Sequence, residues 1–173
     1  MLIIDGIYGS KEHWFEDQSW PKGGLVIKAL QDKGFAIMIL DAVYHGKRSA
    51  ENDYRGPSFK YPNTARDMII QTAIEYRRSI DYLSTRKDID TTQIGVLGLS
   101  MGGLITFQLA SIDSRIKTAI AELTPLIKAK FEPVLATTFA SHISCDSFLM
   151  FMGNKDRWYT IEEARQLYGL IPI

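Results

Sequence analysis

The sequence contains a single cysteine, Cys145, among its 173 residues. One cysteine excludes a disulfide within the chain and any metal site built from several cysteines, and it fits a reducing compartment. Neither sign of charge is in excess, because 20 Lys and Arg residues balance 20 Asp and Glu residues. Without a net field, nucleic acid is not expected as a partner.

Long apolar runs are also missing. The longest stretches, such as residues 35–40 and 148–152, are far shorter than the ~20 residues that a membrane-spanning helix needs, so no membrane interaction is expected. The first residues, MLIIDG, lack the basic start and the cleavage site of a signal peptide. These absences together favour a cytoplasmic location.

The composition that remains is typical of a globular protein, with 46% hydrophobic and 23% charged residues. Short apolar runs bounded by turn residues alternate with segments of helical periodicity, which is typical of βα units around a parallel sheet. We therefore predict the α/β class, with a mostly parallel sheet flanked by helices on both faces. The predicted strands are residues 2–4, 35–40, 94–97, 118–121 and 148–152, and the predicted helices are residues 24–33, 64–83, 102–110 and 161–170. Residues 42–62 form the longest predicted loop, and such loops commonly border the active site in this class.

The most informative segment is residues 98–103, GLSMGG, a G-x-S-x-G pattern between a predicted strand and a predicted helix. A serine on such a sharp turn needs small residues two positions away on either side, and Gly98 and Gly102 meet that need. The turn would expose the Ser100 hydroxyl above the carboxyl end of the sheet. It would also place the N–H of Met101 at a helix N-terminus, where negative charge is favoured.

Two other interpretations of this segment exist. A glycine-rich turn without chemistry is the first, and the strand–turn–helix context argues against it. A phosphate-binding turn is the second, and it is disfavoured because neither G-x-x-x-x-G-K-S/T nor G-x-G-x-x-G accompanies the glycines.

Residues 81–103, ending in QIGVLGLSMGG, resemble the segment that leads into the nucleophile elbow of dienelactone-hydrolase-like and prolyl-oligopeptidase-like members of the α/β-hydrolase superfamily. Residues 34–41, with the later His45, are similar to the fourth strand of that family and the loop beyond it. Residues 2–9, LIIDGIYG, resemble its third strand and first oxyanion loop, with Asp5 in place of the usual histidine. The resemblance covers nearly the whole chain and implies one α/β-hydrolase domain without a separate lid domain.

The resemblance implies a serine hydrolase acting on carboxylic esters or related acyl compounds, with a small-molecule substrate and without a metal or organic cofactor. Ser100 is the implied nucleophile. Asp156, after the last predicted strand, is the implied carboxylate that orients a histidine, and an ordinary turn aspartate is the alternative. The N–H groups of Met101 and Ile7 are the implied oxyanion hole, with Tyr8 as the alternative to Ile7.

No histidine follows Asp156, although the general base of the family lies on a loop after an eighth strand. The first two strands of the family also have no counterpart before Met1. We therefore expect a domain shortened at its ends and an impaired activity, because a serine hydroxyl needs a neighbour that takes its proton. His13 and His45 are the alternatives as base, ahead of His142.

A non-catalytic binding module or an inactive fragment is the second interpretation of the whole chain. Missing end strands would also expose a sheet edge, which favours association into a homo-oligomer.

Overall fold

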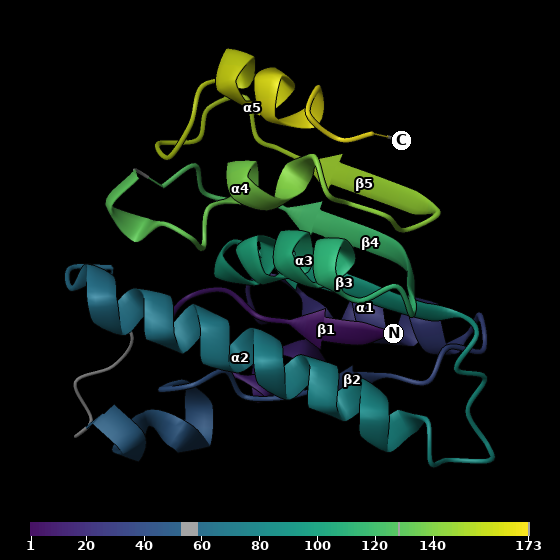
Figure 1. The fold of residues 1–173 in the computed structure, drawn as a ribbon. Coiled ribbons are helices and arrows are strands. Elements are labelled where there is room, and N and C mark those ends of the chain that lie inside the picture. The colour runs from purple at the N-terminus through teal and green to yellow at the C-terminus, as the bar shows by residue number, and fades with distance from the viewer. Residues whose placement is uncertain (53–58, 128, 173) are drawn as a thin grey trace.

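The computed structural model describes residues 1–52, 59–127 and 129–172. Its centre is a parallel sheet with the strand order β2-β1-β3-β4-β5 (Figure 1). The strands are β1 (Leu2–Ile4), β2 (Met38–Ile39), β3 (Ile94–Leu99), β4 (Ile116–Glu122) and β5 (Ser147–Phe151). Each predicted strand region overlaps one of these strands, and β3 and β4 are longer than predicted.

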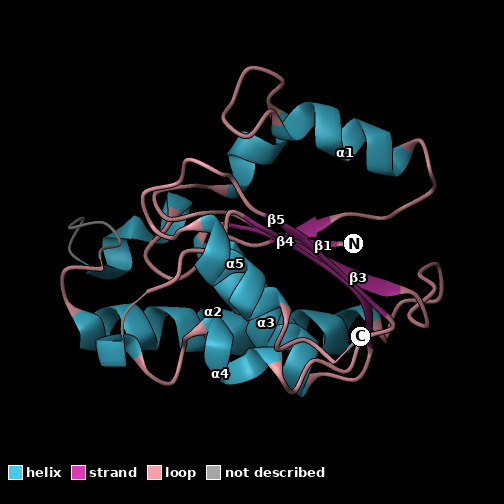
Figure 2. Ribbon diagram, turned by 90° about the horizontal axis from the view of Figure 1, so that it is seen from above, coloured by secondary structure: helices cyan, strands magenta, loops and turns pink. Residues whose placement is uncertain are grey.

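Helices cover both faces of the sheet (Figure 2). Helix α1 (Gly23–Gln31) packs on one face, where its Ile27 joins Ile3 and Leu97 in an apolar cluster. The other face carries α2 (Pro62–Leu83), α3 (Met101–Ile112), α4 (Ala136–Ala140) and α5 (Ile161–Tyr168). The α/β class with helices on both faces is therefore confirmed.

Several short elements were not predicted. They are α4 and the 3-10 helices η1 (Lys11–Phe15), η2 (Gly46–Asn52) and η3 (Ala129–Phe131). Helix η2 occupies part of the predicted loop over residues 42–62, and residues 53–58 of that loop lie outside the described residues.

Helix α2 forms where the apolar stripe predicted it. The stripe is buried, and its members are Met68, Ile69, Thr72, Ala73, Tyr76 and Ile80. The helix begins at Pro62, a residue whose fixed φ and missing N–H suit the first helical turn. Helix α3 has no polar face, and residues 101–110 are all buried, because it lies between the sheet and its neighbouring helices. This central position fixes the segment that carries Ser100.

Strand β2 is shorter than the predicted residues 35–40. Its ladder with β1 pairs Leu2 with Met38 and ends one residue later. At Leu40 the side chain of Tyr76 from α2 lies between the two strands. Its hydroxyl accepts from the Leu40 N–H at 3.1 Å and donates to the Ile3 carbonyl at 2.6 Å. A helix side chain therefore replaces the next rung of the ladder.

The outer edge of β5 has no neighbouring strand within the described residues. On the α1 side of the sheet, Leu149 and Phe151 of β5 are 50% and 53% exposed. An open edge with exposed apolar side chains is the surface on which the homo-oligomer prediction depends, and that prediction remains to be tested.

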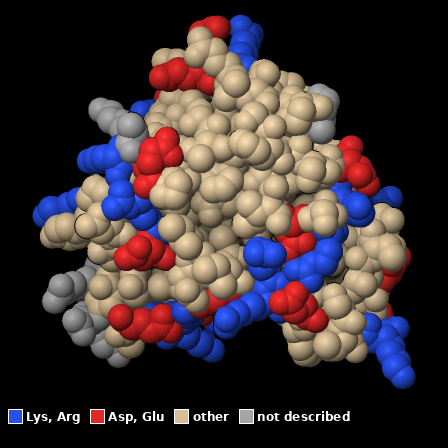
Figure 3. All heavy atoms as spheres, viewed as in Figure 1, with Lys and Arg blue, Asp and Glu red and all other residues tan. Residues whose placement is uncertain are grey.

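Charged side chains of both signs lie intermixed around a broad uncharged centre on the face shown in Figure 3, in agreement with the balanced composition. None of the helices in the described part of the chain is both long and apolar enough to cross a membrane. The single-domain organisation and the cytoplasmic location stay predictions.

Candidate active site

Ser100 lies at the junction of β3 and α3 with φ 54° and ψ −111°, a backbone conformation that residues with a side chain rarely adopt. Two hydrogen bonds hold the junction. The Ser100 N–H donates to the carbonyl of Glu122 at 2.7 Å, and the Ser100 carbonyl accepts from the N–H of Gly103 at 2.9 Å. The strained residue is therefore tied to β4 on one side and to the first turn of α3 on the other.

The glycines around Ser100 are required by close approach. A Cβ added at Gly98 would collide with the carbonyl of Gly102 and the hydroxyl of Thr106. A Cβ added at Gly102 would collide with the carbonyl of Ile4. Helix α3 thus packs directly on the backbone of β1 and β3, and the packing explains the need for small residues at both positions.

The predicted oxyanion donors come from two segments beside Ser100. Met101 is the first residue of α3, and Ile7 and Tyr8 lie in a turn closed by the bond from the Gly9 N–H to the Gly6 carbonyl at 3.0 Å. A Cβ built on Gly6 would lie 3.9 Å from the Ser100 Oγ. No acceptor in the described residues takes the N–H of Met101, Ile7 or Tyr8, so these groups are free to meet a negative oxygen.

The carboxyl group of Asp5 stabilises this turn. Its Oδ1 accepts from the N–H of Gly6 at 2.7 Å, and its Oδ2 lies 3.4 Å from Nδ1 of His13. Burial raises the pKa of Asp5 above its usual value, although the bond from Gly6 opposes the shift. Asp5 therefore helps to shape the turn.

Asp156 lies in the loop after β5, on the same rim of the sheet as Ser100, since β3, β4 and β5 are parallel. Its Oδ1 accepts from the N–H of Trp158 at 2.8 Å. The loop is held further by the hydroxyl of Tyr159, which accepts from the N–H of Gly153 at 2.8 Å. Within the described residues no hydrogen bond joins Asp156 to Ser100, and Asp156 is not among the described residues that line the cavity beside Ser100.

A cavity of about 880 Å³ opens beside Ser100. Ile7 and Tyr8 line it from the turn after β1, and Arg157 and Trp158 line it from the loop after β5. The remaining described lining residues are Phe59, Lys60, Pro125, Leu126, Ile127, Lys130 and Phe131. The structure therefore places Ser100, the predicted oxyanion donor Ile7 and its alternative Tyr8 around one space.

Part of the cavity wall was missed from the sequence. Phe59 packs edge-to-face on Phe131, with ring centroids 5.7 Å apart, and on Trp158 at 6.4 Å. Leu126 and its neighbours follow the carboxyl end of β4, and the rule that such loops border the site in parallel sheets would have found them. Phe59 belongs to the predicted loop over residues 42–62, which the same rule places at the site, whereas no comparable pattern marks Phe131.

Comparison with known proteins decides the family. The family described as alpha/beta hydrolase fold matches the chain over residues 1–159. The chain belongs to the alpha/beta hydrolase fold family.

Sequence relatives match parts of this alpha/beta hydrolase. YtaP from Bacillus subtilis (strain 168), assigned as a hydrolase, is 40% identical over 42 residues, which are 24% of this chain and 14% of that protein. The uncharacterized protein YcjY from Escherichia coli (strain K12) is 33% identical over 94 residues, which are 54% of this chain and 27% of that protein. The matched segments thus span less than a third of either relative.

Solved structures share the fold over almost the whole chain. The esterase Pf2001 from Pyrococcus furiosus superposes with a TM-score of 0.69 at 18% identity, covering 98% of this chain and 66% of that one. A protein from Klebsiella pneumoniae assigned as a dienelactone hydrolase gives 0.67 at 18% identity, covering 97% and 67%. The resemblance seen in the sequence is confirmed at the level of the fold.

None of the three histidines of this alpha/beta hydrolase is among the described residues that line the cavity. His13, in η1, accepts from the N–H of Ser10 at 3.3 Å. His45 is buried, and its Nδ1–H donates to the carbonyl of Val43 at 2.8 Å. Burial lowers the pKa of His45, which favours the neutral ring. His142 is exposed in the segment before β5, toward the opposite rim of the sheet.

The described part of the chain offers no cluster of side chains that could bind a metal ion. No group of three or more His, Cys, Asp or Glu side chains there is arranged to hold an ion. Glu122 pairs with Leu99, the residue before Ser100, in the ladder of β3 and β4, and burial raises the pKa of its carboxyl group.

Proposed function

We propose that this chain is a serine hydrolase that acts on carboxylic esters or related acyl compounds, with Ser100 as the nucleophile. The observation that carries the proposal is the position of Ser100, at a strained strand-to-helix turn whose serine lines a cavity of about 880 Å³. Membership of the alpha/beta hydrolase fold family supports the same reaction class.

The proposed reaction begins when the Ser100 Oγ attacks the carbonyl carbon of the ester, and the hydroxyl proton passes to a base. The carbonyl oxygen becomes an oxyanion, which the N–H groups of Met101 and Ile7 would stabilise at the wall of the cavity. The alcohol leaves with a proton, and water then releases the acid from the acylated serine. Asp156 would orient the histidine that serves as base in the mechanism implied by the resemblance.

None of the three histidines is among the described lining residues of the cavity, which supports the proposal that proton transfer is the weak step of the mechanism. General base catalysis contributes about 10²–10⁴-fold in enzymes. We therefore propose a low turnover for this chain by itself, with the oxyanion donors and the cavity supplying what catalysis remains.

Added imidazole tests this proposal. Hydrolysis of 4-nitrophenyl butyrate is measured with the wild-type chain and with Ser100→Ala, over a series of imidazole concentrations. The direct reaction of imidazole with the ester is the same in both samples and cancels in the difference. The proposal predicts a difference that grows with imidazole, because the added base enters the cavity and takes the Ser100 proton. Equal rates at every concentration would refute it.

The second candidate is a binding module with the same fold. The absence of a histidine from the described lining of the cavity favours it. The module would bind small acyl compounds in the cavity without any Ser100-dependent hydrolysis, with or without imidazole.

A further inference from the structure

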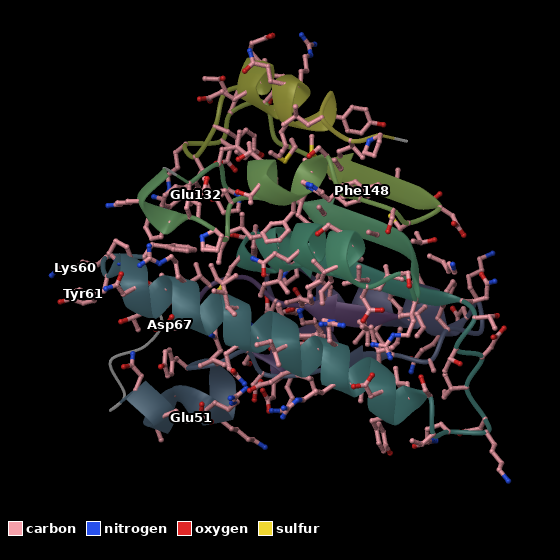
Figure 4. All side chains as sticks on the ribbon, in the orientation of Figure 1. Glu51, Lys60, Tyr61, Asp67, Glu132 and Phe148 are labelled. Atoms are coloured by element: carbon pink, nitrogen blue, oxygen red, sulfur yellow. The ribbon has the colours of Figure 1, made fainter. Side chains whose placement is uncertain are left out.

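The cavity beside Ser100 is positively charged, although the whole chain has no net charge. Three cations line it: Lys60, Lys130 and Arg157. They come from the turn before α2, from η3 and from the loop after β5, so three segments far apart in the sequence bring the same charge to one space. Lys60 is labelled in Figure 4. No aspartate or glutamate is among the described residues of the lining.

Two of the cations lie against the aromatic wall of the cavity, which consists of Phe59, Phe131 and Trp158. The guanidinium carbon of Arg157 lies 5.5 Å from the centre of the Trp158 ring, and the Nζ of Lys130 lies 5.3 Å from the centre of the Phe131 ring. Contacts of this kind position a cation without neutralising its charge. The wall therefore offers flat apolar surface and positive charge side by side.

The acidic groups close to these cations have other partners. The carboxylate of Glu132, labelled in Figure 4, accepts from the hydroxyl of Thr138 at 2.8 Å. Asp156 accepts from the backbone of Trp158. In the described part of the chain no carboxylate forms an ion pair with Lys130 or Arg157. Their charges are thus available to a ligand.

We propose that the site selects acyl compounds that carry an anionic carboxylate in addition to the ester, with Lys130 and Arg157 binding that carboxylate. The inference rests on the proposed function, which supplies the ester as the reacting group. It adds that the substrate carries a negative charge. A single exposed ion pair changes affinity by about two- to fivefold. Two cations that line the same cavity strengthen the preference, because both attract the same carboxylate.

Binding of two esters of equal shape tests the proposal. Monobenzyl succinate carries a carboxylate, and its amide, benzyl succinamate, is neutral. Dissociation constants are measured by ligand-observed NMR at low salt for the wild-type chain, for Lys130→Gln/Arg157→Gln and for Lys155→Gln. Lys155 is the matched control, an exposed cation in the same loop as Arg157 that does not line the cavity. Both esters are also tested for protection of Ser100 against a fluorophosphonate.

The proposal predicts that the wild-type chain and Lys155→Gln bind the anionic ester at least about fivefold more tightly than the neutral one. The double variant should bind both esters with affinities within about twofold, and 0.5 M salt should reduce the wild-type preference. Equal affinities in the wild-type chain, or a preference that survives in the double variant, would overturn the proposal.

The same samples separate this proposal from the proposed hydrolase function. If the fluorophosphonate labels Ser100 but the two esters bind equally well, the anionic substrate is refuted and the hydrolase function is not. A charge preference that the double variant loses, in a chain that does not react at Ser100, supports the anionic ligand and refutes the hydrolase function. Because Lys130 and Arg157 are exposed, the variants should keep the fold, and circular dichroism checks that they do.

Discussion

The backbone N–H of Ser100 donates to the carbonyl of Glu122 at 2.7 Å, one residue beyond the last paired rung of β3 and β4. The same serine is the N-cap of α3. One residue must therefore end a strand and start a helix, and it does so with a φ of 54°. The strain is maintained by the ladder on one side and by the close packing of α3 on the other.

Substitution of Gly98 should break this arrangement. In Gly98→Ala the new methyl group meets the Gly102 carbonyl and Thr106, both fixed in α3, so the helix must move away from the sheet. We expect a loss of at least about 2 kcal/mol in the free energy of unfolding, together with slower fluorophosphonate labelling. Urea denaturation measures the first effect and gel fluorescence the second.

Gly153→Ala is the matched control on the same rim. The nearest atom to its added methyl group is 3.7 Å away, which is ordinary contact. The expected change is within about 0.5 kcal/mol. If both variants are equally stable, the close approach of α3 to β3 is not what requires Gly98.

Tyr159 should stabilise the loop that carries Asp156. Its buried hydroxyl accepts from the N–H of Gly153, and Tyr159→Phe leaves that N–H without its partner. We expect a cost of about 1–2 kcal/mol in the free energy of unfolding. Tyr168→Phe removes the hydroxyl of a side chain that is 49% exposed and should change stability little. A Tyr159→Phe chain as stable as wild type would argue against this hydrogen bond.

His45 should make folding stability depend on pH. Burial lowers its pKa in the folded chain, so the unfolded chain binds a proton more readily. Its contribution is present above the unfolded pKa of about 6.5 and is lost as the pH falls through that value. Urea denaturation at pH 8 and pH 5.5 should give a smaller difference for His45→Asn than for the wild type. His142→Asn, at an exposed position, should keep the wild-type difference, and a His45→Asn chain that also keeps it would contradict this account.

The main elements could be predicted because their patterns are local. Helix α2 has a stripe of apolar residues at helical spacing, and β3 is a short apolar run that ends directly before Ser100. The length of β2 could not be predicted in this way. Residues 35–40 have one continuous apolar character, yet the ladder ends where Tyr76, 36 residues further on than Leu40, takes the Leu40 N–H. A contact between distant segments leaves no local pattern.

The candidate site also has a part that could be predicted from the sequence and a part that could not. Ser100 and its glycines could be predicted because an elbow depends on residues two positions apart. The aromatic wall could be predicted only in part. Trp158 follows the predicted carboxylate and Phe59 lies in a loop expected to border the site, but their meeting with Phe131 depends on tertiary packing. The positive charge of the cavity has the same origin, since the chain as a whole is neutral.

The central claim is that Ser100 is a reactive nucleophile. The most direct measurement is a fluorophosphonate reaction followed by trypsin digestion and mass spectrometry of the peptide over residues 88–115. The account predicts one adduct, on Ser100, which Ser100→Ala abolishes. Ser111→Ala should keep it, although Ser111 lies in the same peptide and its hydroxyl donates to the Gln108 carbonyl at 2.8 Å. Equal labelling of the wild-type chain and Ser100→Ala, or an adduct on another residue, would contradict the account.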